Sequence, residues 1–140
     1  MTYTIGKLSK LTGCNIETLR YYEREGLLPT PPRGSNGYRY YNDEAISRVK
    51  FILHAKRLGF SLKEIDELLS IRVEKDAKTC ADVKEIALGK LSIIQQKIQE
   101  LETMYHALDR VAQSCDGSAN SAHYCTILQS LEAEGFEGGN

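Results

Sequence analysis

The sequence predicts a mainly α-helical protein with an N-terminal winged helix-turn-helix, a long dimerisation helix, and a C-terminal loop that ends in a short helix. Three observations favour this fold class. Apolar residues near the N-terminus keep helical spacing on both sides of a glycine. A proline-rich segment with an Asn-Gly pair follows. A single apolar stripe then continues from residue 83 to residue 112 without a proline.

Two short helices are expected before residue 26. Ile5, Leu8 and Leu11 keep helical spacing until Gly13 interrupts them, and Asn15 is an expected N-cap for the second helix. A helix pair joined by a tight, glycine-containing turn is the helix-turn-helix arrangement. The exposed face of the second helix would carry the candidate DNA contacts Thr18, Arg20, Tyr21 and Arg24.

A hairpin wing is expected after the second helix. The prolines between residues 29 and 32 disfavour helix, and Asn36-Gly37 between two short extended pieces is a signal for a tight hairpin. Basic and phenolic side chains on such a wing are suited to holding phosphates in place. The candidate DNA contacts here are Arg33, Tyr38, Arg39 and Tyr41.

Charge is distributed unevenly along the chain. Residues 1–60 carry 10 Lys and Arg against 5 Asp and Glu, whereas residues 61–140 carry 8 against 14. The basic part also holds six of the eight tyrosines. A basic, phenol-rich surface favours a polyanion such as double-stranded DNA as the partner over a membrane or a small acid.

Three further helices are expected after the wing. Asn42 would cap the first, and Ser61 with Glu64 would open the second as a capping box. A polar joint then leads to a helix over 80–113, whose stripe is too long to be buried in a small globule and should pair with a second copy of itself. The expected divisions are 1–72 for the winged helix-turn-helix domain with its connecting helices, 73–79 for the joint, 80–113 for the coiled-coil helix, 114–134 for the metal-binding loop and short helix, and 135–140 for a flexible tail.

Four cysteines occur in a chain with no signal-peptide pattern and no membrane-spanning stretch, which predicts a cytoplasmic protein with thiols rather than structural disulfides. Cys80 and Cys115 lie at opposite ends of the long helix, roughly 50 Å apart at 1.5 Å per residue. If two such helices pair antiparallel, Cys80 of the partner subunit arrives beside Cys115 and Cys125. Three thiolates suit zinc, cadmium, lead or mercury, and Asp116 or His123 could complete a tetrahedral zinc site.

Two other classes of protein compete with this interpretation. A redox sensor would use Cys115 and Cys125 as a disulfide pair. A thiol enzyme would want a Cys-x-x-Cys arrangement or a similar reactive thiol beside a base, and the sequence holds no such spacing, no phosphate-binding glycine loop and no nucleophile elbow. We therefore expect a protein that is not an enzyme.

Several motifs resemble the MerR family of bacterial transcription factors. They are Thr4-Ile-Gly-Lys-Leu-Ser-Lys10, Glu17-Thr-Leu-Arg-Tyr-Tyr-Glu-Arg-Glu-Gly-Leu-Leu-Pro29, Arg33-Gly-Ser-Asn-Gly-Tyr-Arg-Tyr-Tyr41 and Leu58-Gly-Phe-Ser-Leu-Lys-Glu-Ile65. Cys80, Cys115 and the ending Tyr124-Cys-Thr-Ile-Leu-Gln-Ser-Leu-Glu132 are similar to the zinc, cadmium and lead branch, especially its zinc-export regulators.

This resemblance implies a homodimer with winged-helix heads and an antiparallel coiled coil. Such a dimer sits on a promoter, and metal binding distorts the DNA so that RNA polymerase can engage it, usually to express an exporter of the same metal. Copper-type relatives lack a cysteine matching Cys80, so the resemblance implies a divalent ion, zinc first, with cadmium and lead as alternatives. This chain has Asp116 where zinc-export regulators have a second cysteine, and Asn120 where they have histidine. Both departures favour cadmium or lead.

Overall fold

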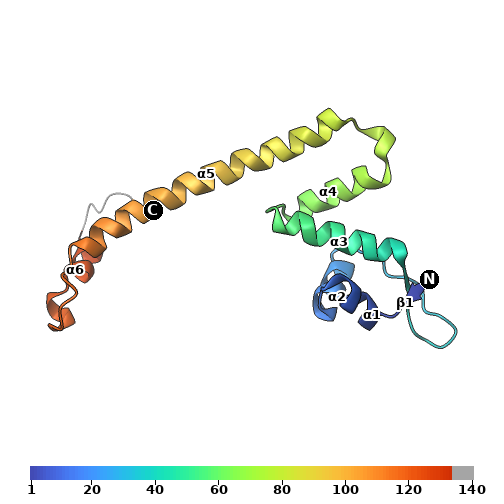
Figure 1. Ribbon diagram of the computed structural model, residues 1–140, viewed down its shortest axis with the longest axis horizontal. Helices are drawn as coiled ribbons and strands as arrows, with labels where there is room; N and C mark the ends of the chain where they lie inside the picture. The colour runs from blue at the N-terminus through green and yellow to red at the C-terminus, as the bar shows by residue number, and fades with distance from the viewer. Residues whose placement is uncertain (134–140) are drawn as a thin grey trace. The chain divides into compact units, whose positions relative to one another are not determined.

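The computed structural model describes residues 1–133, and the chain divides into two compact units, Met1–Lys90 and Leu91–Asn140. The tail expected over 135–140 lies outside the described residues, as does residue 134 at the end of the expected loop segment. The described chain is mainly helical, as the sequence predicts (Figure 1). Within residues 1–133, no helix combines the length and the apolar character that crossing a membrane requires.

Two short helices open the first unit. α1 (Ile5–Thr12) and α2 (Ile16–Arg24) are each capped by a side chain: Thr4 accepts a hydrogen bond from the Lys7 N–H, and Asn15 accepts one from the Thr18 N–H. Gly13 ends α1 with a φ of 74°, a left-handed conformation that glycine adopts without steric cost. The predicted helix-turn-helix and the predicted Asn15 cap are confirmed.

A short two-stranded sheet, which the sequence does not predict, ties the N-terminus to the end of the wing. β1 (Thr2–Tyr3) pairs antiparallel with β2 (Tyr41–Asn42), with Tyr3 opposite Tyr41. The Tyr3 hydroxyl also donates a 2.7 Å hydrogen bond to Asp43 at the start of the next helix. Two-residue strands are too short for a period-two pattern, and this explains why no signal of them is visible.

The wing is a hairpin, but its turn differs from the one that an Asn-Gly pair favours. Arg33 and Arg39 form an isolated antiparallel bridge, the Gly34 N–H donates to the Tyr38 carbonyl, and the Gly37 N–H donates to the Gly34 carbonyl. Gly37 has a φ of 85°, whereas among residues 1–133 no residue other than glycine has a positive φ. A type I′ turn would need a positive φ at Asn36 as well, so the loop is a three-residue turn with glycine in the left-handed position.

α3 (Asp43–Arg57) and α4 (Leu62–Val73) complete the core of the first unit. Asn42 caps α3, and Ser61 with Glu64 forms the predicted capping box of α4. The most deeply buried side chains come from all four helices and from the segment after α2: Leu8, Leu19, Leu27, Leu28, Val49, Ile52, Ile65 and Leu69. Cys14 and Tyr22 also lie in this core.

A short 3₁₀ turn, η1 (Lys75–Ala77), leads to the long helix α5 (Cys80–Gln113), drawn in yellow and orange in Figure 1. The Thr79 hydroxyl accepts from the Asp82 N–H, and Asp82 accepts in return from the Thr79 N–H at 2.8 Å, so a reciprocal cap sets the start of α5. The helix therefore has the bounds expected from the sequence. η2 (Ala122–Tyr124) and α6 (Thr126–Glu132) follow it.

Candidate functional site

A basic cavity of about 180 Å³ lies where the helix pair meets the wing. Three arginines converge on it from two elements, Arg20 from α2 and Arg33 and Arg39 from the wing. Among the residues that the structure describes, no aspartate or glutamate lines this cavity. The remaining lining residues are Thr4, Ile5, Gly37, Tyr38 and Tyr41. Three guanidinium groups without a lining carboxylate make the cavity suited to a phosphate group.

Backbone carbonyls hold two of these arginines in place. Arg33 Nη1 donates to the Gly37 carbonyl at 2.9 Å, and Arg39 Nε donates to the Pro31 carbonyl at 3.0 Å. Each guanidinium has five N–H donors, so most of them stay available for a ligand. Thr4, which sequence reasoning did not select, brings the N-terminus of α1 to the same cavity. Thr4 could have been found from the sequence as a threonine directly before a helix, because threonine is favoured at the N-cap position.

Tyr41 lines the basic cavity but is otherwise enclosed in the core. Its side chain is only 3% exposed, and its hydroxyl donates a 2.7 Å hydrogen bond to Glu23 on α2. Burial, followed by this hydrogen bond, raises the pKa of Tyr41. Tyr41 thus fastens the base of the wing to α2 from within the core, and its role as a DNA contact stays a prediction.

The other candidates on α2 lie outside the basic cavity. Tyr21 is exposed, and the Arg24 guanidinium lies 5.9 Å from the centre of its ring. Thr18 is half-buried near the start of the helix, where its N–H donates a hydrogen bond to Asn15.

Tyr38 on the wing is the most exposed of the candidate tyrosines, with 67% of its surface exposed. The exposed side chains of this group remain available to a partner at the protein surface.

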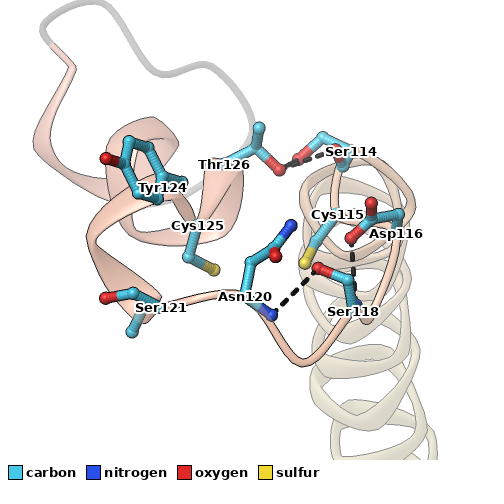
Figure 2. Close-up of a pocket in the computed structure, with 10 residues that line it drawn as sticks. Ser114, Cys115, Asp116, Ser118, Asn120, Ser121, Tyr124, Cys125 and Thr126 are labelled. Carbon is cyan, nitrogen blue, oxygen red and sulfur yellow. Dashed lines mark hydrogen bonds between the residues drawn. The ribbon is translucent and has the colours of Figure 1, made fainter.

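A second cavity, of about 360 Å³, lies at the C-terminal end of α5 (Figure 2). Cys115 comes from the residues just after the helix, and Cys125 comes from the residue that precedes α6. Figure 2 shows both sulfur atoms on the side of the loop that faces this cavity. The two thiols that the sequence places ten residues apart therefore share one site.

Hydrogen bonds of the loop explain why the thiols meet. The Ser114 hydroxyl donates to Thr126 Oγ1 at 3.0 Å, and the Thr126 hydroxyl donates to the Ser114 carbonyl at 2.6 Å. These bonds close the loop directly beside both cysteines. Neither residue was selected from the sequence, because a serine and a threonine twelve residues apart carry no recognisable pattern.

The electrostatics of the loop favour the anionic form of Cys125. Its pKa is lowered by the backbone N–H groups of Leu128 and Ile127, with a smaller contribution from the Cys115 thiol. The Gly117 N–H also donates to the Cys115 sulfur at 3.4 Å. N–H groups aimed at both sulfurs suit thiolates, which are the metal-binding form of cysteine.

The two candidates for an additional ligand differ in position. Asp116 lines the cavity, but its Oδ1 accepts the Ser118 N–H at 2.9 Å, which lowers the pKa of this carboxyl. His123 is not among the lining residues and packs edge-on against Tyr124, with ring centres 5.1 Å apart. Of the two, only Asp116 therefore faces the cavity.

One chain supplies an incomplete donor set for a metal. Within residues 1–133 of a single chain, no group of three or more His, Cys, Asp or Glu side chains is placed to hold an ion. Cys80 is exposed at the first residue of α5. Two thiols in a polar cavity fit a soft or borderline cation.

Comparison with known proteins finds similar chains over nearly the whole length of this one. A family model described as MerR HTH family regulatory protein matches residues 3–71, and a second, described as MerR, DNA binding, matches residues 46–111. The chain is 40% identical to the HTH-type transcriptional regulator ZntR of Escherichia coli (strain K12), over 98% of this chain and 99% of the relative. It is 37% identical to the mercuric resistance operon regulatory protein of Bacillus cereus, over 94% of this chain and 98% of that relative. Among solved structures, PbrR691 from Ralstonia metallidurans CH34 in complex with lead(II) matches with a TM-score of 0.80 and 32% identity, over 92% of this chain and 98% of that one.

Proposed function

The chain belongs to the MerR family of helix-turn-helix transcriptional regulators, and from this premise we propose that it activates transcription of metal efflux or resistance genes in response to a divalent metal ion. The observation that carries the proposal is the pair Cys115 and Cys125, two thiols that share one polar cavity beside the dimerisation helix. A relative of similar architecture is known in complex with lead(II), and another regulates mercuric resistance. Zinc is our first candidate for the ion, and cadmium and lead are the alternatives.

We expect the protein to act as a homodimer because α5 has two different faces. Ala107 and Val111, near the C-terminal end of α5, are buried in the single chain. The predicted stripe is on another face, and its larger members are exposed in the single chain: Val83, Leu91, Ile98, Leu101, Tyr105 and Leu108. A stripe of this length at steps of three and four fits a second copy of the same helix.

Antiparallel pairing of two α5 helices would complete the metal site. It would bring the exposed Cys80 of the partner subunit to Cys115 and Cys125, giving three thiol donors at each end of the coiled coil. Three sulfur donors suit zinc, cadmium or lead, and Asp116, which lines the cavity, would supply an oxygen donor for zinc.

Binding of the ion would act on the promoter through the joint between α4 and α5. A metal favours the DNA-distorting state only by the difference between its affinities for the two states. Bending DNA costs on the order of a few kcal/mol, and the metal would offset this cost by binding the thiolates more tightly in the DNA-distorting state than in the other state. RNA polymerase would then engage the distorted promoter.

Arg20→Ala should weaken operator binding without changing the number of metal ions bound. Arg20 lines the basic cavity, so the variant loses about one phosphate contact per subunit. The steepness of the plot of log affinity against log salt concentration should therefore fall by about one for each phosphate contact that is lost. Operator titrations at several salt concentrations measure both quantities. Arg57→Ala, which removes an exposed arginine outside the cavity, is the matched control. An unchanged salt slope for Arg20→Ala would contradict its placement at a phosphate.

The function itself is tested by transcription in a purified system. The protein, RNA polymerase and the upstream DNA of its own gene are combined at buffered free concentrations of zinc, cadmium, lead, mercury and copper(I). We expect activation by zinc at the lowest free concentration, or by cadmium or lead if Asp116 and Asn120 have changed the site. Silence with every metal would contradict the proposal and favour a redox role for Cys115 and Cys125.

A further inference from the structure

One ion pair connects the long helix to the DNA-binding unit. Lys90 Nζ of α5 lies 2.8 Å from Glu64 Oε1 of α4, and the two side chains are only 11% and 28% exposed. The ammonium also lies 6.0 Å from the centre of the Phe60 ring. A lysine with so little exposure is held in place by its partners and is not a freely solvated surface charge.

The same carboxylate oxygen has a second role. Glu64 Oε1 accepts the Ser61 N–H at 2.7 Å, while the Ser61 hydroxyl accepts the Glu64 N–H at 3.2 Å. One atom therefore joins the capping box of α4 to Lys90 of α5. These contacts, that of Lys90 first, lower the pKa of Glu64 to about 2, so the carboxylate stays charged at neutral pH.

Glu64 is next in the sequence to buried residues of the DNA-binding unit. Ile65, the next residue, and Leu69, one helical turn further, are fully buried against the other helices of the core. Among residues 1–133 there is one other salt bridge, between Arg72 and Glu44, and it lies within the first unit without involving α5. A displacement of α5 near Lys90 would thus reach the core through Glu64.

We propose that Lys90 and Glu64 are positioning residues that transmit the state of the long helix to the DNA-binding core during induction. This inference rests on the proposed function, because induction is the process in which α5 and the core must move together. The pair touches neither the candidate metal cavity nor the basic cavity. Its loss should therefore affect the connection between the two sites and leave each site intact.

Two substitutions remove the pair while preserving its surroundings. Lys90→Met keeps an unbranched apolar chain against Phe60 but removes the ammonium. Glu64→Gln removes the charge and keeps a residue that still forms a capping box. Lys84→Met, at an exposed lysine on the same helix, is the matched control. The double variant Lys90→Met/Glu64→Gln shows whether the two side chains act as one unit.

We measure the ratio of metal-induced to basal transcription, together with operator affinity, metal affinity and the thermal midpoint. Each single variant should lower the induction ratio by about fivefold, and the double variant should lower it no further, because coupled residues are not additive. Operator affinity of the metal-free protein and metal affinity should stay within about twofold of the wild type, as expected for sites that the pair does not touch. Lys84→Met should behave as the wild type.

Three results would overturn the inference. Unchanged induction in both single variants, with a wild type that responds to metal, would refute the coupling and leave the proposed function standing. A loss of operator affinity equal to the loss of induction would show that the pair only stabilises the fold. A wild type that does not respond to any metal would refute the proposed function, and the coupling with it.

Discussion

Cys115→Ser should abolish induction by metal while binding of the operator is retained. A serine hydroxyl is protonated at neutral pH and is a poor ligand for soft or borderline cations, so the site loses a thiolate donor. The loss of metal affinity should exceed the roughly 10–100-fold that follows removal of an outer hydrogen-bond partner of a metal ligand. Transcription with titrated metal and a gel-shift assay with operator DNA measure the two activities separately.

The control for this variant is Asn120→Ala, which changes a cavity-lining residue that carries no thiol. It should keep metal affinity within about one order of magnitude of the wild type, as expected for a residue that is not itself a ligand. Loss of operator binding by Cys115→Ser would contradict the separation of metal sensing from DNA binding.

Mixed dimers extend the same prediction to the shared site. A Cys115→Ser subunit paired with a Cys80→Ser subunit has one end of the coiled coil with all three thiols intact and one end with two thiols missing. If each site combines Cys80 of the partner subunit with Cys115 and Cys125, the mixed dimer should bind about half the metal of the wild type, whereas either parent dimer lacks a complete site. No recovery on mixing would contradict a site shared between subunits.

Leu101→Glu should separate the dimer and remove most of the operator binding. Leu101 lies in the middle of the stripe and is 61% exposed in the single chain. Burying a leucine contributes about 1.5–3 kcal/mol, and the substitution replaces this gain with a buried carboxylate in each subunit. Two linked heads bind roughly 10²–10⁴ times more tightly than one, so the monomer should lose about this factor. Sedimentation equilibrium and operator titration measure both effects.

Gln99→Glu introduces the same charge on a face of α5 that does not carry the stripe, and it should leave the dimer intact. If Leu101→Glu stays dimeric at the same concentrations, the stripe is not the subunit interface. A monomer that binds the operator as tightly as the wild-type dimer would instead contradict the need for two linked heads.

Most of the helices could be predicted from capping residues and from the spacing of apolar residues along the chain. Asn15, Asn42 and the pair Ser61 and Glu64 were expected as caps from the sequence, and each forms the expected hydrogen bond. The long helix begins and ends at Cys80 and Gln113, as its stripe indicated. These features depend on residues three or four positions apart, and such neighbours meet in any helix.

Features that join distant segments escaped sequence reasoning. The pairing of Tyr3 with Tyr41 has no local signal, and neither does the closure of the loop by Ser114 and Thr126. Tyr41 was a candidate DNA contact, and the structure buries its ring in the core and gives its hydroxyl an acceptor on Glu23. At the wing, Asn36 keeps a negative φ because the glycine after it takes the left-handed position.

The amino-acid sequence by itself determined most of the helices, several of their caps, the apolar stripe of α5 and the family, because each of these is encoded in short-range spacing or in contiguous motifs. Cys115 and Cys125 share one cavity, as expected from the sequence, whereas other groupings were decided by the tertiary structure alone. The tertiary structure gathered Arg20, Arg33 and Arg39 around one cavity, left His123 out of the lining of the thiol cavity, and placed Lys90 on Glu64. Such meetings depend on how packed elements are oriented, and the spacing of residues along the chain does not specify that orientation.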